Sequence, residues 1–286
     1  MGGNALKHLN VQRIDAAEYG SRLQRFDEII KSISKNGLTI AIGYPMSLYG
    51  KLDYGDLDVI YWSNDPEKVR TELLTALDSR GFKKNGQVTS IEWENFQLDM
   101  IYASLETFEW QLNWYSHGDA SAIRGRVYRY YNFKFGHDGL YYNIRSKNGS
   151  KDILVTRNWV EAHKLMGYKA LSNMHMYTEP EIFEHTVSSP NVHRDIFDLL
   201  NPDRPRSTQV AFYEWVKDQG TDLETIKPRE YGLRLLFNYD KILFLKVSFE
   251  QYRMNLREFY NPIKKKFRKF MWTKVYPVAF KIRGWL

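Results

Sequence analysis

The spacing of hydrophobic residues near the start of the chain predicts helices and strands in alternation. Apolar residues recur three and four positions apart over residues 19–33, which predicts one face of a helix ending near Asn36 and Gly37. Residues 38–42 are a short apolar run with β-branched side chains and predict a buried strand. The Gly- and Tyr-rich residues 43–55 then predict a loop.

Beyond this loop the hydrophobic pattern predicts a strand, a helix and two further strands. Residues 58–62 predict a second strand, and Pro66 behind a polar turn predicts the start of a helix that stops at Gly81. Residues 88–93 and 96–101 predict a further pair of strands. The first third of the chain is therefore expected to form a small mixed sheet with helices on one side.

The rest of the chain predicts a hairpin followed by helices. Residues 127–135 and 140–144 flank a Gly-rich turn and predict two paired strands. Residues 152–156 predict another strand, with Thr156 capping a following helix. From Glu179 onward the pattern is mainly helical, with prolines marking loops at Pro190, Pro202 and Pro205. The whole pattern predicts the α+β fold class.

Composition narrows the class of protein. With 286 residues and 43% hydrophobic content the chain can bury a core. It has no cysteine, which excludes disulfides, thiolate zinc sites and cysteine nucleophiles. Its seven histidines show no metal-ligand spacing. Because no apolar run reaches signal or transmembrane length, we expect no stable membrane insertion and a cytoplasmic protein, in the host cytoplasm if the chain is viral.

Positive charge is concentrated at the end of the sequence. The formal net charge is +7, and residues 261–286 contain eight basic residues and no acidic ones, which leaves about −1 for residues 1–260. Aromatic residues are interleaved with the cations, a pattern that suits nucleic acid, a helix with a wet basic face, or a membrane surface. The candidate nucleic-acid-binding residues are Lys264, Lys265, Lys266, Arg268 and Lys269.

Three aspartates are the candidate metal-binding residues. Asp56 and Asp58 lie two apart in a predicted strand and therefore project from the same side, whereas their apolar neighbours face the core. Asp99 is a lone acid in another predicted strand. Turn chemistry and a solvent-facing edge would each explain such acids singly. Together, carboxylates on neighbouring strands form an oxygen-rich site for Mg²⁺, with Mn²⁺ as the alternative.

The arrangement of these residues resembles the DNA polymerase beta superfamily of nucleotidyltransferases. Their signature is an apolar residue and Gly, then two acids separated by one apolar residue, then a third acid on a later strand. Here Ile42-Gly43, Gly55-Asp56-Leu57-Asp58-Val59-Ile60 and Asp99 supply the three parts, and the similarity covers about residues 25–105. Residues 152–167 also look like a region of uncharacterised viral and bacteriophage members.

One part of the signature differs. Tyr44-Pro45 follows Gly43 where the superfamily usually has Ser, and Ser47 is the nearest hydroxyl that could replace it. Gly50 and Gly55 would let backbone N–H groups approach phosphate oxygens, and Lys51 is a candidate cation for the phosphates. The resemblance thus implies nucleotide binding by Gly43, Ser47, Gly50, Lys51 and Gly55.

The resemblance implies two-metal transfer of a nucleoside monophosphate from an NTP or dNTP to an acceptor hydroxyl. Asp56 and Asp58 would bind both ions, and Asp99 would complete the ion at the acceptor. We expect an RNA or DNA end as acceptor, with a protein or a small molecule as alternative acceptors. A non-catalytic nucleic-acid-binding role is the alternative function.

The resemblance and the pattern of predicted elements together divide the chain into three regions. Residues 1–105 would be the catalytic core, 106–178 a mixed β/α extension and 179–286 a mainly helical region with a basic tail. Nothing in the sequence specifies an oligomeric state.

Overall fold

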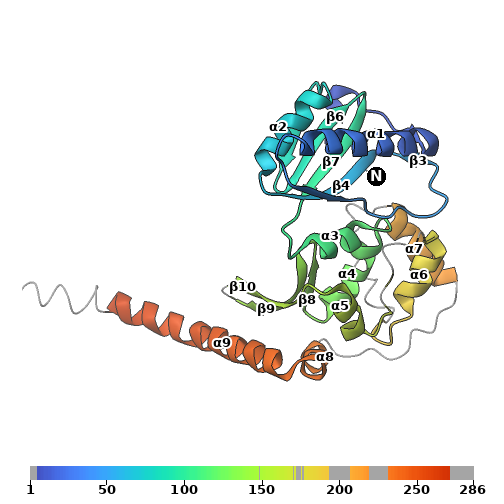
Figure 1. Cartoon of the computed structure of the whole chain (residues 1–286). Coiled ribbons are helices and arrows are strands. Elements are labelled where there is room, and N and C mark those ends of the chain that lie inside the picture. The colour runs from blue at the N-terminus through green and yellow to red at the C-terminus, as the bar shows by residue number, and fades with distance from the viewer. Residues whose placement is uncertain are drawn as a thin grey trace, which may run out of the picture.

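A five-stranded mixed sheet forms the N-terminal lobe, the upper one in Figure 1, of the computed structural model. The structure describes residues 5–147, 149–169, 171, 175, 177–192, 207–218 and 231–270. The strand order is β2-β4-β7-β6-β5, in which β4 and β7 are parallel and the other neighbours are antiparallel. The strands are β2 (Ile40–Gly43), β4 (Asp56–Ser63), β5 (Phe82–Asn85), β6 (Val88–Trp93) and β7 (Phe96–Tyr102).

Two helices cover one face of this sheet. α1 (Ala16–Ser34) begins at Asp15, whose carboxylate accepts a hydrogen bond from the Glu18 backbone N–H at 2.8 Å. α2 (Pro66–Ala76) begins in the same way at Asp65, with proline in the first turn. Short elements precede and follow α1: the 3-10 helix Lys7–Leu9, β1 (Ile14–Asp15) and its partner β3 (Asp53–Tyr54). The α+β class, the two predicted helices and the predicted strands of this lobe are confirmed, but α2 ends at Ala76 rather than at Gly81. The strands β1, β3 and β5 were not predicted.

Side chains along β4 alternate between the hydrophobic core on one face of the sheet and the candidate metal-binding acids on the other. Leu57 and Val59 have no exposed surface and pack in one hydrophobic cluster with residues of α1 and α2. Asp56 and Asp58 project from the opposite face because successive side chains of a strand alternate. Ile60, on that same face, packs in a cluster that includes residues of α3 (Phe108–Tyr115), the first helix of the second lobe. The acids therefore face the junction of the two lobes.

The second lobe, the lower one in Figure 1, is built from α3, a three-stranded antiparallel sheet and further helices. One cluster of buried residues runs through all of these elements and forms the core of this lobe. The elements are α4 (Ala120–Tyr130), β8 (Phe133–Gly136), β9 (Gly139–Ser146), β10 (Gly149–Thr156), α5 (Trp159–Met166), α6 (Glu179–Val187), α7 (Ser207–Asp218), α8 (Tyr231–Tyr239) and α9 (Lys241–Phe270).

Two sequence predictions in this lobe are wrong in detail. The first predicted strand, residues 127–135, is helical up to Tyr130, because Ile123 and Val127 lie four apart on the buried face of α4. Asn132, with φ 64°, then turns the chain into β8. The helix after β10 is capped by Asn158 rather than by Thr156.

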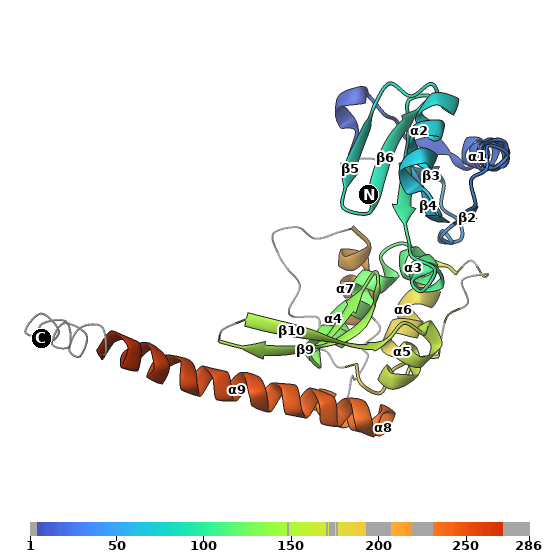
Figure 2. The same cartoon turned by 60° about the vertical axis from the view of Figure 1, so that its left-hand side comes forward.

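The mainly helical C-terminal region is confirmed for α7, α8 and α9, whereas Pro202 and Pro205 lie outside the described residues. In Figures 1 and 2, α9 runs from the second lobe away from the body of the molecule. Its first turns are held by buried Val247 and by an ion pair between Lys151 and Glu250 at 2.8 Å. None of the helices in the described part of the chain is long and apolar enough to cross a membrane.

A buried polar cluster lies in the second lobe between α4, α5 and α6. Arg124 is 1% exposed, and its Nε and Nη2 have no hydrogen-bond partner among the described residues. His163 is fully buried, and its Nδ1 lies 3.0 Å from the Trp159 carbonyl oxygen. Burial, and then the charge of Arg124, lower the pKa of His163 well below its ordinary value and that of His185 to about 4.

This cluster predicts a loss of stability in mild acid. Histidine in the unfolded chain has a pKa of about 6.5, whereas the pKa of His185 in the folded protein is lowered to about 4. The folded state therefore binds fewer protons, and the contribution of His185 is complete above about pH 6.5 and declines toward pH 4 by about 1.4 kcal/mol per pH unit. The measurement is the free energy of unfolding in urea at several pH values.

His185→Gln is the comparison that isolates this effect. The raised pKa values of Asp58 and Asp99 give wild type a slope of the opposite sign, so the difference between wild type and variant is the informative quantity. We expect wild type to lose more stability than His185→Gln between about pH 6.5 and 4.5. Parallel pH profiles for the two proteins would contradict the prediction.

Candidate metal centre

The three predicted acids come together on two neighbouring strands. Asp56 and Asp58 lie on β4, and Asp58 is directly opposite Asp99 in the parallel pairing of β4 with β7. One carboxylate oxygen from each of the three lies within 4.8 Å of the others. Oxygen ligands at this spacing fit a divalent cation of the Mg²⁺ or Mn²⁺ type. The acidic cluster could therefore hold a metal ion.

Asp99 is held in place from its own strand and from the next one. The Nε2 of Gln97 donates to both carboxylate oxygens of Asp99 at 3.0 Å. Ser90 faces Asp99 in the pairing of β6 with β7, and its hydroxyl donates to Asp99 as well. Gln97 is itself buried, and its Oε1 accepts from the Ala5 backbone N–H at 3.0 Å. These contacts fix the orientation of the third acid.

Crowding makes it costly to ionise all three acids together. Burial, followed by repulsion from Asp56 and Asp99, raises the pKa of Asp58 well above its ordinary value. Burial also raises the pKa of Asp99 to about 6, with Asp56 adding to this and the hydrogen bonds from Ser90 and Gln97 opposing it. A bound cation would offset this repulsion.

Two of the three acids line a pocket of about 370 Å³ between the two lobes. Asp56 and Asp58 are in its wall, whereas Asp99 is not among the described residues that line it. One side comes from the N-terminal lobe: Tyr19, Pro45, Met46, Ser47, Leu48, Tyr49, Gly50, Lys51 and Tyr54. The other side comes from the second lobe: Tyr115, Gly118, Asp119, Glu179 and Thr208.

Three of the predicted nucleotide-binding residues line this pocket. Ser47, Gly50 and Lys51 all belong to the loop between β2 and β3. Gly50 has φ 77°, a backbone conformation that glycine adopts without strain. The Nζ of Lys51 lies 4.4 Å from the centre of the Tyr54 ring, and burial lowers its pKa although Asp56 and Asp58 oppose the change. Although the residue is exposed, Lys51 lines the same pocket as Asp56 and Asp58 and supplies a cation beside them.

The other two predicted glycines are not among the described lining residues. Gly43 ends β2 opposite Ile60, and a Cβ added there would lie 3.1 Å from Cδ1 of Leu112 in α3. Gly55 is buried between β3 and β4. The structure thus places Gly43 at the contact between sheet and α3, and Gly55 where the chain enters the strand of the acids.

Sequence reasoning missed the second-lobe side of the pocket. Tyr115 and Asp119 belong to one stretch of the chain and Thr208 to another far from it, and no local pattern connects either stretch with the acids. Glu179 begins α6, where Thr178 and Glu181 form a capping box, and burial raises the pKa of Glu179. The capping box fixes the start of α6 and carries no signal for the pocket.

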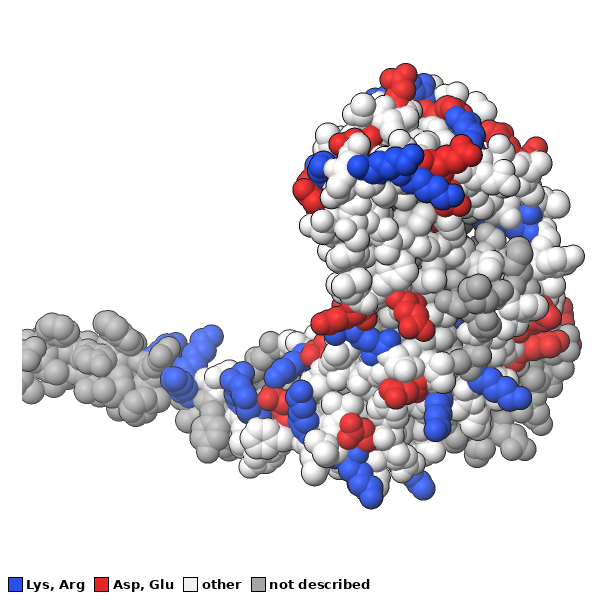
Figure 3. All heavy atoms as spheres, in the orientation of Figure 1, with Lys and Arg blue, Asp and Glu red and all other residues white. Residues whose placement is uncertain are grey.

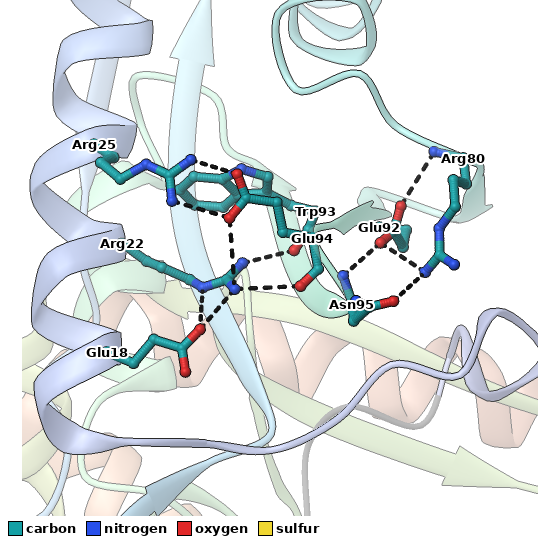
Figure 4. A network of polar contacts seen from close by, with 8 residues as sticks. All are labelled: Glu18, Arg22, Arg25, Arg80, Glu92, Trp93, Glu94 and Asn95. Atoms are coloured by element: carbon teal, nitrogen blue, oxygen red, sulfur yellow. Dashed lines mark hydrogen bonds and ion pairs between the residues drawn. The ribbon is translucent and has the colours of Figure 1, made fainter.

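Two further acids near Asp99 in sequence belong to a separate network, shown in Figure 4. Glu92 pairs with Arg80 at 2.8 Å. Glu94 accepts from Arg25 at 2.9 Å, and this guanidinium lowers the pKa of Glu94. Arg22 donates to the Trp93 carbonyl oxygen at 2.7 Å and ties the same turn to α1. Both glutamates therefore have arginine partners and are not members of the acidic cluster.

The predicted basic tail lies on α9. Lys264, Lys265, Lys266 and Lys269 are exposed, while the side chain of Arg268 lies outside the described residues, as does Trp272. Figures 1 and 2 both show this end of α9 away from the two lobes. The structure does not bring these lysines to the pocket.

Neither a scan against protein-family models nor a comparison with curated proteins finds a match to this chain.

Proposed function

We propose that this protein is a metal-dependent nucleotidyltransferase that moves a nucleoside monophosphate from an NTP or dNTP to an acceptor hydroxyl. The observation that carries the proposal is the cluster of Asp56, Asp58 and Asp99 beside a pocket whose loop supplies Ser47, Gly50 and Lys51. Three carboxylates with one cation and a glycine loop are a suitable set for a metal-bound triphosphate.

In the proposed reaction the donor set would hold two Mg²⁺ ions, or Mn²⁺. Asp56 and Asp58 would hold both ions, and Asp99 would join them at the ion nearer the acceptor. Such ions supply charge neutralisation for the triphosphate and lower the pKa of a coordinated hydroxyl. The orientation of Asp99 by Gln97 and Ser90 supports this, because metal-binding carboxylates need fixed positions.

The chain's own residues would position the triphosphate. Lys51 would pair with phosphate oxygens, and the Ser47 hydroxyl and Gly50 backbone would donate hydrogen bonds to them. In the transfer, the acceptor oxygen forms a bond to the α-phosphorus and the bond from that phosphorus to the bridging oxygen of the β-phosphate breaks. Pyrophosphate leaves with the electron pair of the broken bond, and the acceptor hydroxyl loses its proton to solvent.

A transfer assay tests this function. Purified protein is incubated with Mg²⁺ and each α-labelled NTP or dNTP, with single-stranded RNA, single-stranded DNA or a cell extract as acceptor. We expect an extended oligonucleotide ladder that EDTA abolishes. Label on a protein or metabolite would assign a different acceptor to the same reaction. No labelled product with any acceptor in either Mg²⁺ or Mn²⁺ would refute the proposed function.

A further inference from the structure

A basic groove of about 830 Å³ lies on the second lobe. Its walls come from α3, α4, α7 and the sheet of β8, β9 and β10. Four cations line it, Arg126, Arg129, Lys134 and Arg145, and the lining residues within the described ranges include no aspartate or glutamate. In Figure 3, by contrast, basic and acidic residues are mixed over both lobes in the view shown.

The geometry of α4 explains how the groove forms. Gly125, Arg126 and Arg129 lie on the face of the helix that lines the groove, whereas Ile123 and Val127 are buried on the other. A Cβ added at Gly125 would have no atom within 4 Å, so the absence of a side chain here leaves the groove open. The helix thus presents two arginines beside a gap.

Three arginines and one lysine supply the positive charge of the groove. Lys134 is paired with Asp152 at 2.7 Å. Arg129 and Arg145 are exposed, and the Nη2 of Arg126 donates to Gln209 at 3.4 Å. Burial, and then the charge of Arg129, lower the pKa of Arg126. An anion would therefore relieve repulsion between neighbouring guanidinium groups.

The groove and the metal pocket share a wall. Trp114 lines the groove and the next residue, Tyr115, lines the pocket. On α7, Gln209 lines the groove and Thr208 lines the pocket. Consecutive Cα atoms are about 3.8 Å apart, so a chain lying in the groove needs to cross only this wall to reach the acids.

We propose that this groove binds the acceptor of the transfer reaction as a single-stranded nucleic acid, with Arg126, Arg129 and Arg145 on its phosphates and its end directed to the metal pocket. The proposal rests on the proposed function. A flexible polyanion fits because the cations line a concavity, which a flat membrane does not enter. Trp114 adds a partly buried ring at the groove wall, where a base can stack.

Gly125→Glu and Gly125→Gln form a matched pair of test variants. Both side chains have the same size and enter open space, but only Glu places a negative charge among the arginines. The probes are fluorescein-labelled oligouridine and oligothymidine of about 20 nucleotides, followed by fluorescence anisotropy. We expect Gly125→Glu to weaken binding about tenfold more than Gly125→Gln. Equal affinities for the two variants would overturn the proposal.

A second pair of variants tests the arginines directly. Arg129→Gln with Arg145→Gln should reduce the salt slope of binding by about 1.4, since each single-strand phosphate contact contributes about 0.7. Lys31→Gln with Lys35→Gln removes the same charge from the C-terminal end of α1 on the other lobe and should leave the slope unchanged. Equal loss in both double variants would overturn the groove assignment, as would tighter binding to a duplex than to the single strand.

The binding and transfer assays together distinguish a failure of the groove assignment from a failure of the proposed function. If wild type binds the oligonucleotides through the groove but transfers nothing in any acceptor assay, the proposed function fails and the groove assignment stands as a binding site. If transfer to an oligonucleotide is the same in Gly125→Glu and Gly125→Gln, the groove assignment fails and the transferase stands.

Discussion

Asp58→Asn is expected to abolish nucleotidyl transfer, lowering the rate by about three orders of magnitude or more, roughly 4 kcal/mol of transition-state stabilisation. Asp58 is the central acid: it lies two residues from Asp56 on β4 and opposite Asp99 on β7. Asparagine keeps the size of the side chain and removes the charge that holds a cation. The measurement is label incorporation at saturating NTP, with Mn²⁺ binding followed in parallel by electron paramagnetic resonance.

The fold should survive this substitution. Burial and the two neighbouring acids make a charged Asp58 unfavourable without metal, so a neutral side chain is expected to leave the metal-free protein at least as stable as wild type. Asp78→Asn is the matched control, because Asp78 is exposed and its φ of 46° suits asparagine. Undiminished transfer by Asp58→Asn, or an equal loss of transfer in Asp78→Asn, would contradict the assignment of Asp58 as a metal-binding residue.

The acidic cluster could be predicted because its information is local. Asp56 and Asp58 share a face through strand alternation alone, and the apolar neighbours of Asp99 marked a second strand. The loop residues Ser47 and Lys51 were predicted from the resemblance to the superfamily signature, which places the phosphate-binding loop between two predictable strands. What the pattern could not supply is the pairing of β4 with β7, which depends on the assembled sheet.

In the second lobe, local sequence patterns were not sufficient to predict the structure. Residues 127–130 are apolar and aromatic enough for a strand, yet they are helical because Val127 and Tyr128 fill the core of the lobe. Tyr128 stacks on Phe135 at 4.5 Å, a contact that exists only once β8 has folded back on α4. The far wall of the metal pocket and the basic groove depend on this long-range packing, so sequence patterns predicted neither.

The attachment of the C-terminal helices to this lobe depends on Gly232, and Gly232→Ala is expected to destabilise the protein by about 3 kcal/mol. A Cβ at Gly232 would lie 2.1 Å from the carbonyl oxygen of Tyr131 and 2.9 Å from its carbonyl carbon. Both are backbone atoms at the end of α4, so no side-chain rotation relieves the clash. α8 would have to separate from the core, exposing Leu235 and Leu236, which are 8% and 0% exposed.

Gly125→Ala is the matched control, since the same substitution at this helical glycine of α4 meets no atom within 4 Å. It should stabilise the protein by about 0.5–1 kcal/mol through helix propensity. Urea unfolding of the two variants gives the comparison, and hydrogen exchange locates the damage. We expect faster exchange in α8 and α9 of Gly232→Ala while the sheet that carries Asp58 and Asp99 stays protected. Similar free energies of unfolding for the two variants would show that α8 does not pack against Tyr131.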